Sequence, residues 1–335
     1  MDTQTCDKAR QSFIDAGALL SKIYNFPQTI TVAAEFADLC TTLGGCTTDR
    51  TIVGAAAPSR FFSMTGEDGA VRIYPQILTK FANPTSAVPF DTHDIIASFN
   101  SKLAPYFFFS GDTDITPKQV DFVGVVAHEF HHGLGFLSSW RPSGVDNVVT
   151  PLIHVDGSNK LRVRETIFDQ FIIRTADGKP LTEFTAKFEQ AIDGQTYTTD
   201  AALASTIEMV ATDNLITTAT DYITPNAIGF LPKGKTNIID AVILETALNP
   251  FAVGSTGSHV DFTTYSNSPD WLMVYNVIQG KTFQQIDQDN GAATPDTIVG
   301  PNIKAIMESM GLPTPDNPNP FVPTIVNEEP ISNEN

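Results

Sequence analysis

The stretch that most constrains how this chain folds is TPKQVDFVGVVAHEFHHGLGF, residues 116–136, because it has the full pattern of one amphipathic helix. Thr116 is a favourable N-cap, and Gln119 three residues later can complete a capping box. Apolar side chains then recur at helical spacing and give the segment one face for a core. Gly133 and Gly135 end the pattern, because glycine adopts the left-handed conformation that closes a helix. We therefore predict one helix over this stretch.

The helix contains the motif HEFHH, in which His128 and His132 are four residues apart and Glu129 follows the first of them. Side chains four apart lie on the same face of a helix, so the two imidazoles can ligate one metal ion. Imidazoles at this spacing suit zinc, with Zn–N bonds of about 2.0–2.1 Å. Glu129 is rotated by about a third of a turn and can accept a proton from a water on the metal. The motif therefore predicts a zinc site with Glu129 as general base.

The third zinc ligand is not fixed by this motif. Catalytic zinc sites usually have three protein ligands and one open position. The chain has six histidines, and those outside the pair are His93, His131, His154 and His259. His131 lies between the two ligands on a different face of the helix, so we expect an ordinary polar helix residue there. From the residues alone, the other three stay open as candidates.

The run HEFHHGLGF, followed much later by SHVDFTTYSNSPDWLM, resembles the metzincin clan of zinc peptidases, and within it the leishmanolysin-like enzymes with an HExxHxLGF signature. In most metzincins a third histidine follows three residues after the glycine that ends the helix. Gly135 matches that glycine, but Ser138 occupies the histidine position. In the leishmanolysin-like branch a long insertion precedes the third histidine, and the resemblance assigns that role to His259. It also assigns to Met273 the methionine turn beneath the metal.

The resemblance further suggests a role for Tyr275, two residues beyond Met273. Astacin-like and serralysin-like metzincins place a tyrosine there, which touches zinc or stabilises the oxyanion of the tetrahedral intermediate. The alternative is an ordinary half-buried tyrosine. Asp261 is likewise either a partner that orients a ligand histidine or a plain aspartate of a strand or turn.

The resemblance implies both a fold and a reaction. The expected fold class is α+β, a metzincin-like zincin with a twisted mixed sheet, an active-site helix and a large insertion before the C-terminal subdomain. The expected function is that of a zinc-dependent endopeptidase, a metalloprotease that hydrolyses peptide bonds in proteins or peptides. His128, His132 and His259 would hold one Zn²⁺, and Glu129 would act as the general base.

The motifs and turn signals divide the chain into four parts. These are an N-terminal α/β subdomain at 1–135, an insertion at 136–250, a C-terminal subdomain at 251–312 and a tail at 313–335. We expect the tail to be disordered, because it is rich in proline and lacks Lys and Arg. Strand-like runs over residues 94–101 and 106–110 are expected to include the sheet edge that lines the substrate cleft.

The composition restricts the partners and the location of the protein. The net charge of −18 and the pI of about 4.5 argue against nucleic acid or an anionic membrane surface as a partner. No apolar run reaches the roughly 18 residues that span a bilayer. The first residues, MDTQTCDKARQ, lack the apolar region of a signal peptide, so either a leader was removed or the chain is intracellular. We expect a secreted or extracellular monomer whose partner is its protein or peptide substrate.

All three cysteines, Cys6, Cys40 and Cys46, lie near the N-terminus, which suggests one disulfide and one remaining thiol. The pairing of Cys40 with Cys46 is favoured, and Cys6 with either of them is the alternative. A third hypothesis is that Cys6 caps the zinc as a zymogen switch. The run DQDNG at 287–291 raises the question of structural Ca²⁺, but it lacks the other ligands of an EF-hand loop, so a turn is favoured.

Two rival interpretations stay open. In the first, the third ligand is a glutamate, Glu165 or Glu208, as in a gluzincin-like site, and His259→Ala would then spare zinc binding. In the second, the chain is a non-catalytic adhesion or binding protein on a metalloprotease fold, because a fold alone does not imply activity. The intact Glu129 speaks against the second, since a structural zinc needs no base. Hydrolysis of casein or gelatin separates the two classes.

Overall fold

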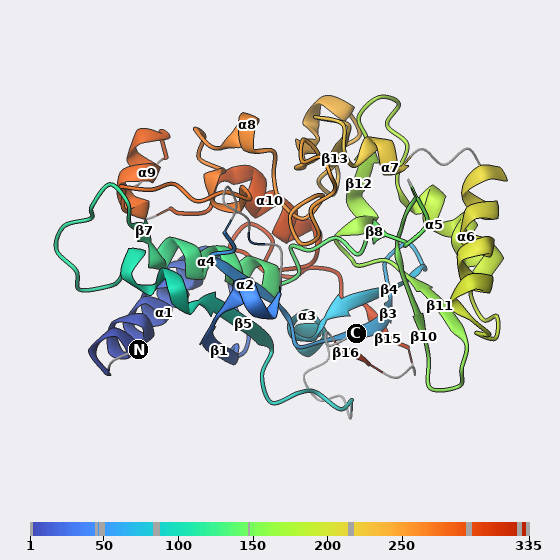
Figure 1. Cartoon of the computed structure of the whole chain (residues 1–335), viewed down its shortest axis with the longest axis horizontal. Helices are drawn as coiled ribbons and strands as arrows, with labels where there is room; N and C mark the ends of the chain where they lie inside the picture. Colours follow the sequence, from blue (N-terminus) through green and yellow to red (C-terminus); the bar gives the residue numbers. More distant parts are fainter. Residues whose placement is uncertain are drawn as a thin grey trace.

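The computed structural model describes residues 3–43, 46, 51–82, 88–146, 148–213, 218–292, 297–326 and 330–332. The described chain mixes helices with several small sheets, which confirms the expected α+β class. In Figure 1 the C-terminal elements, in orange, lie on one side of the HExxH helix, and the N-terminal elements, in blue, lie on the other. The insertion, in green and yellow, extends to one end of the molecule.

A three-stranded sheet forms the centre of the N-terminal part. Its strand order is β1-β5-β2, with bounds Val32–Ala37, Ile95–Asn100 and Gly54–Pro58. Strand β1 runs parallel to β5, whereas β2 runs antiparallel to it. The expectation that the run at 94–101 or the run at 106–110 forms the edge of this sheet is wrong, because β5 has a strand on both sides and the run at 106–110 contributes a strand to a separate small sheet. The edge beside the HExxH helix is β2 instead, and that helix packs against it.

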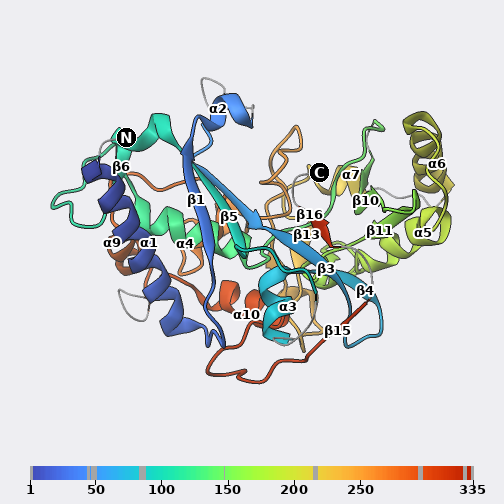
Figure 2. The same ribbon diagram turned by 90° about the horizontal axis from the view of Figure 1, so that it is seen from below.

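An N-terminal helix, α1 (Thr3–Ile23), precedes the sheet and packs against the HExxH helix, α4 (Phe122–Gly133). In Figure 2 α1 lies to the left of β1, and the neighbouring helix α4 passes behind β1 and β5. The buried side chains of α1 recur at helical spacing and are Ala9, Ser12, Ala16, Leu19 and Leu20. This spacing is typical of a helix with one face in the core.

Helix α4 begins at Phe122, so the predicted start at Thr116 is wrong. Thr116 donates its backbone N–H to Gln119 Oε1 at 2.9 Å, but this closes a local turn only. The chain then forms β7 (Val120–Asp121), which pairs with β6 (Phe107–Phe108). Asp121 is the true N-cap, and its Oδ1 accepts the Gly124 N–H at 3.1 Å. The local pattern could not show that a remote strand pairs with the start of the predicted helix.

Phenylalanine rings fix the first turn of α4. The ring centroid of Phe122 lies 4.8 Å from that of Phe107, 5.1 Å from that of Phe99 and 5.6 Å from that of Phe36. Aromatic pairs at such separations add about 0.5–1.5 kcal/mol each beyond the burial of their area. The cluster therefore joins β1, β5 and β6 to the helix that carries the HExxH motif.

His131, expected as an ordinary polar residue, is fully buried on the side of α4 that faces Tyr24, the residue directly after α1. Its Nδ1 lies 2.7 Å from the Ala127 carbonyl oxygen, and its Nε2 lies 2.9 Å from the Tyr24 hydroxyl. Because a carbonyl oxygen can only accept, Nδ1 carries the proton and Nε2 accepts from the Tyr24 O–H. Burial lowers the pKa of His131 to about 4, which keeps this neutral form at pH 7.

We expect Tyr24→Phe to reduce the free energy of unfolding by about 1–3 kcal/mol, because it leaves the buried His131 Nε2 without a donor. Urea denaturation followed by circular dichroism measures the change. Tyr197→Phe is the matched control, since the Tyr197 hydroxyl donates to Asp200 at the surface, at 2.9 Å. We expect the control to change stability by less than about 0.5 kcal/mol. Equal losses in the two variants would contradict the prediction.

The tail at 313–335 is not disordered where the structure describes it, so that prediction is wrong. A second sheet contains β3 (Arg60–Thr65) and β4 (Val71–Pro75), and β15 (Thr324–Ile325) and β16 (Ile331–Ser332) both pair with β3. An edge strand presents unpaired N–H and C=O groups that another segment can satisfy. Composition predicted disorder because it contains no information about this free edge.

The insertion packs partly around a small core of its own. Hairpin β10–β11 (Leu152–Val155 and Leu161–Arg164) packs against α5 (Thr182–Ile192), and α5 packs against α6 (Asp200–Asp213). The side chains buried in this core are Leu161, Val163, Phe188, Ile192, Ile207 and Val210. A sheet of β12, β13 and β14 (Ile172–Arg174, Ile228–Phe230 and Val242–Ile243) contributes to the main core instead.

The remaining elements are short. The helices are α2 (Leu39–Thr42), α3 (Gln76–Ala82), α7 (Thr218–Asp221), α8 (Phe262–Tyr265), α9 (Phe283–Asp289) and α10 (Pro301–Ser309). The 3₁₀ turns are η1 (Ser101–Tyr106), η2 (Asp169–Phe171), η3 (Ile238–Asp240) and η4 (Trp271–Met273), and β8 (Arg141–Pro142) pairs with β9 (Val149–Thr150).

Cys40, on α2, forms a disulfide with Cys46, and Cys6 is an exposed free thiol. Within the part of the chain that the structure describes, no helix combines the length and the hydrophobicity needed to cross a bilayer.

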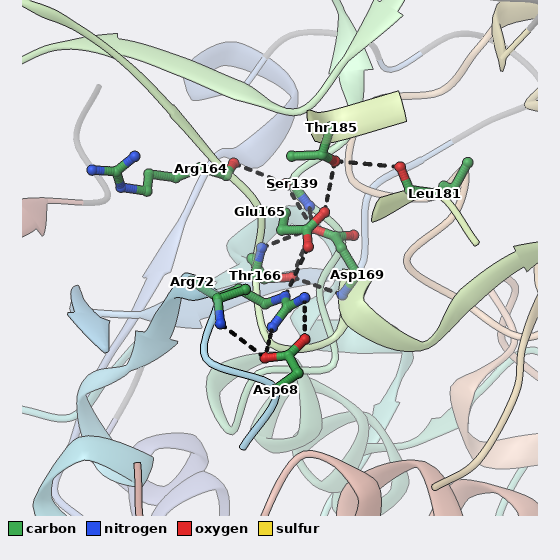
Figure 3. Close-up of polar contacts among 10 residues, drawn as sticks. Asp68, Arg72, Ser139, Arg164, Glu165, Thr166, Asp169, Leu181 and Thr185 are labelled. Carbon is green, nitrogen blue, oxygen red and sulfur yellow. Dashed lines mark hydrogen bonds and ion pairs between the residues drawn. The ribbon is translucent and has the colours of Figure 1, made fainter. Parts of the chain in front are cut away.

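A buried polar cluster joins the insertion to β4 (Figure 3). Arg72, on β4, donates through Nε to Glu165 Oε1 at 2.8 Å and pairs through Nη2 with Asp68 at 2.8 Å. The hydroxyl of Thr185 donates to Glu165 Oε2 at 2.6 Å. Burial raises the pKa of Glu165 to about 7 and outweighs the attraction of Arg72, which is shared with Asp68.

We expect metal-free protein to lose stability as the pH rises from about 5 to 8, in part through Glu165. Its pKa is higher in the folded chain than in the unfolded one, so the folded state binds more protons between the two values. The stability is therefore greatest below the unfolded pKa and falls as the pH passes the folded value of about 7. A pKa shift of this size corresponds to a change on the order of 3 kcal/mol in the free energy of unfolding.

Chemical denaturation at pH 5 and pH 8 tests this expectation. Glu165→Gln should flatten the pH dependence, because the amide does not titrate. The exposed Glu67→Gln is the control and should keep the dependence of the original chain. Parallel pH profiles for all three proteins would show that Glu165 titrates alike in the folded and unfolded states.

Candidate metal centre

Two glycines allow the end of α4 to lie close to its neighbours. A Cβ on Gly133 would lie 2.4 Å from the Ile95 side chain, so only glycine lets the helix approach β5 here. Gly135 has a φ of 110°, and a Cβ there would lie 2.6 Å from Pro75 Cγ. The turn at Gly135 brings the Phe136 carbonyl oxygen within 2.8 Å of His132 Nδ1. The predicted role of Gly135 in ending the helix therefore has a second part, which is to place a hydrogen-bond acceptor for a candidate ligand.

Three imidazoles converge on one point. The Nε2 atoms of His128 and His132 are 3.1 Å apart, and His259 Nε2 lies 3.1 Å from the first and 3.2 Å from the second. His132 and His259 are buried, whereas His128 is half-buried. Among the described residues, these are the three metal-ligating side chains that come together as a group. The structure thus brings His259 to the histidine pair of α4.

Backbone carbonyls fix the orientation of all three rings. The Nδ1 atoms of His128, His132 and His259 lie 2.6, 2.8 and 3.1 Å from carbonyl oxygens. Carbonyl oxygens only accept hydrogen bonds, so each Nδ1 carries a proton and each Nε2 presents a lone pair. The Nε2 atoms cannot then hydrogen-bond to one another. They form a donor set that a cation satisfies.

The donor set fits zinc. Tetrahedral zinc bound at about 2.0–2.1 Å keeps its imidazole nitrogens about 3.3 Å apart, close to the separations in this site. Burial lowers the pKa of His128 to about 4 and that of His132 to about 3, and the second ring is lowered further by its neighbour. Both are therefore neutral at pH 7, which is the form that ligates a metal.

Glu129 is buried beside the triad and next to strand β2. Only 4% of Glu129 is exposed, and its Oε2 has no hydrogen-bond partner within the described chain. Burial raises the pKa of Glu129 to about 8, while a hydrogen bond from the Ala56 backbone acts in the opposite direction. A Cβ on Gly54 would lie 2.6 Å from Glu129 Oε1, so glycine is needed where β2 passes the carboxylate. The carboxylate is therefore placed by both α4 and β2.

The turn that contains Met273 lies directly against the ligands. The Leu272 carbonyl oxygen accepts from His128 Nδ1, and the Met273 carbonyl oxygen accepts the Val260 N–H at 2.9 Å. The Met273 side chain is fully buried. Asp270 anchors the turn by accepting the Ile303 N–H at 3.0 Å, in the first turn of α10. The turn thus joins α4, the His259 segment and the C-terminal helix.

Tyr275 and Asp261 have local contacts of their own. Tyr275 is 37% exposed, and its ring centroid lies 5.6 Å from that of Phe262. Its hydrogen-bonding role at the metal stays a prediction. The Asp261 carboxylate caps α8 by accepting the Thr264 N–H at 2.7 Å, so that oxygen does not orient a ligand ring.

The alternative ligands lie elsewhere in the described chain. Glu165 is held by Arg72 and Thr185, and Glu208 is exposed on α6. The run at 287–291 forms the end of α9 rather than a calcium loop, and Asp287 Oδ1 accepts from the Trp271 indole at 2.8 Å.

Two buried acids that the sequence did not single out support the site. The Glu245 N–H donates to the His259 carbonyl oxygen at 2.8 Å, and the Glu245 carboxylate accepts the Phe262 N–H at 3.1 Å. Asp169 holds the segment that follows α4. No sequence motif identifies these two acids, because the hydrogen-bond partners that connect them to the site are far away in the sequence.

Comparison with known proteins places the chain in a family without assigning it an activity. An uncharacterized protein of Schizosaccharomyces pombe, PB7E8.01, is 26% identical over 351 residues, which cover 92% of this chain and 60% of that relative. The chain thus spans less than two thirds of the length of the relative. No solved structure matches the chain. A family model described as SPBPB7E8-like matches residues 1–332, and the chain therefore belongs to the SPBPB7E8-like family.

Proposed function

We propose that this protein is a zinc-dependent endopeptidase with a metzincin-like fold. One observation carries the proposal. Three imidazoles present their Nε2 atoms 3.1–3.2 Å apart beside a buried carboxylate whose Oε2 has no hydrogen-bond partner in the described chain. A purely structural zinc site needs no such carboxylate. The glycine turn at Gly135 and the buried turn at Met273 add to the similarity with metzincins.

The residues divide the chemistry between them. His128, His132 and His259 would hold the ion, which when bound supplies a Lewis acid that activates water and polarises a carbonyl group. Glu129 Oε2 is the atom that accepts a proton from the attacking water and returns it to the leaving amine. Burial raises the pKa of Glu129 in the metal-free chain, whereas a cation bound beside it would favour the carboxylate that accepts the proton.

The edge strand β2 is the proposed binding surface for an extended peptide. It pairs with β5 on one side, and no described strand pairs with its other side. An extended peptide can add to such an edge through main-chain hydrogen bonds. Because β2 passes Glu129, the scissile bond of a peptide on this edge would lie near the carboxylate. This placement favours a protein or peptide substrate.

The proposed location is outside the cell. Cys40 and Cys46 form a disulfide, and disulfides persist in oxidising compartments. The acidic composition suits a protein that binds neither nucleic acid nor anionic membrane surfaces, and we propose that it acts as a monomer.

Metal content and proteolysis together test the proposed function. We expect about one zinc per chain and hydrolysis of casein or gelatin. Removal of zinc by a chelator should abolish hydrolysis, and added Zn²⁺ should restore it. A protein that holds one zinc and cleaves neither substrate would favour the adhesion or binding alternative. A protein that takes up no zinc would rule out the proposed mechanism.

A further inference from the structure

A buried aspartate organises the segment that follows α4. Asp169 is fully buried, and its Oδ1 accepts the Ser138 hydroxyl at 2.6 Å. Its Oδ2 accepts the Ser139 N–H at 2.9 Å, the Ser139 hydroxyl at 2.6 Å and the Thr166 N–H at 2.9 Å. Figure 3 shows Asp169 among Ser139, Thr166 and Glu165, beside the Arg72 cluster. The insertion thus fixes residues 138 and 139 through a single side chain.

Ser138 connects this aspartate to the metal centre in two directions. Its backbone N–H donates to the Ser258 hydroxyl oxygen at 3.1 Å, and Ser258 directly precedes His259. Two residues before Ser138, the Phe136 carbonyl oxygen accepts from His132 Nδ1 at 2.8 Å. Residues 136–138 therefore hydrogen-bond both to the ligand candidate His132 and to Ser258, the neighbour of the ligand candidate His259.

His259 depends most on this connection. Its Nδ1 lies 3.1 Å from the Ser255 carbonyl oxygen, whereas the corresponding distances are 2.6 Å for His128 and 2.8 Å for His132. His128 and His132 are also held by the regular backbone of α4, but His259 lies on an irregular segment between β14 and α8. The hydrogen bond from Ser138 to Ser258 adds a fixed point next to the ligand that lacks a helix.

We propose that Asp169 is a positioning residue for the metal centre and acts through Ser138 and Ser258. It would fix the distance between His132 and His259 and so set the affinity for zinc. The inference rests on the proposed zinc site. In most metzincins the position of Ser138 would carry the third ligand itself, whereas in this chain it carries the link to that ligand. The insertion accordingly contributes to metal binding without providing a ligand.

Ser258→Ala tests this link with little change in volume. Loss of a hydrogen bond that supports a ligand typically weakens metal binding about 10–100-fold, and we expect a loss of at least tenfold in zinc affinity. Ser309→Ala is the matched control, because the Ser309 hydroxyl also accepts a backbone N–H, that of Lys233 at 2.9 Å. We expect the control to keep the original zinc affinity. Zinc affinity is measured by competition with a chromophoric chelator.

A second readout separates positioning from a general loss of stability. The visible spectrum of the Co²⁺-substituted protein reports ligand geometry, and we expect it to change in Ser258→Ala and in Asp169→Asn but not in Ser309→Ala. If Ser258→Ala binds zinc as tightly as the original chain, the inference is wrong and the proposed function stands. If the original chain itself binds no zinc, the proposed function fails, and the inference fails with it. Asp169→Asn is informative only if the variant folds. The result with Ser258→Ala decides the test whether or not Asp169→Asn folds.

Discussion

Replacing His259 with alanine is expected to remove stoichiometric zinc binding while the chain stays folded. Apparent binding energies of about 10–16 kcal/mol for four-ligand zinc sites correspond to roughly 3–4 kcal/mol per ligand, or about a hundred- to thousandfold in affinity. The remaining pair, His128 and His132, lies on a helix that is held independently by its packing against α1 and β2. Zinc content after dialysis and circular dichroism measure the two quantities separately.

Two further variants make the His259 experiment specific. His93→Ala changes a histidine outside the triad and should bind zinc like the original chain. Glu165→Gln should also bind zinc normally, because Glu165 is held by Arg72 and Thr185. Unchanged zinc binding in His259→Ala, with loss in Glu165→Gln or Glu208→Gln, would restore the gluzincin-like alternative.

Glu129→Gln should separate metal binding from catalysis. The amide has nearly the same size as the carboxylate and is no part of the imidazole triad, so we expect about one zinc per chain in this variant. It cannot accept the proton, and loss of a general base typically lowers the rate about 10²–10⁴-fold. Hydrolysis of a quenched fluorescent peptide, with zinc measured on the same sample, checks both expectations.

Glu189→Gln is the matched control for Glu129→Gln. Glu189 is a glutamate on α5 in the insertion whose pKa is also raised by burial, but it lies outside the candidate metal centre. We expect this variant to retain both zinc and activity. Equal activity in Glu129→Gln and the original chain would remove Glu129 from the mechanism.

The HExxH part of the candidate site could be predicted because its residues are close together in the sequence. His128, Glu129 and His132 lie within five consecutive helical residues, so periodicity alone places them together. His259 could not be found in that way, since no rule of spacing connects it to α4. The resemblance to metzincins identified it, and the structure brings its Nε2 within 3.2 Å of both partners.

The errors in the sequence analysis share one physical cause. The start of α4 depends on pairing between β6 and β7, and the order of the tail depends on the free edge of β3. Asp169 is defined by donors more than 25 residues away, on Ser138 and Ser139. Each of these features is decided by a partner that is remote in the sequence, so neither periodicity nor composition carries the information.

The separation between the two halves of the triad has a consequence for synthesis of the chain. His259 follows His132 by 127 residues. A ribosome that adds about 5–20 residues per second needs on the order of ten seconds to make that stretch. A nascent chain therefore carries the HExxH helix for that time with only two of the three candidate ligands. Under the proposed function, hydrolysis could begin only once synthesis of the chain is nearly finished.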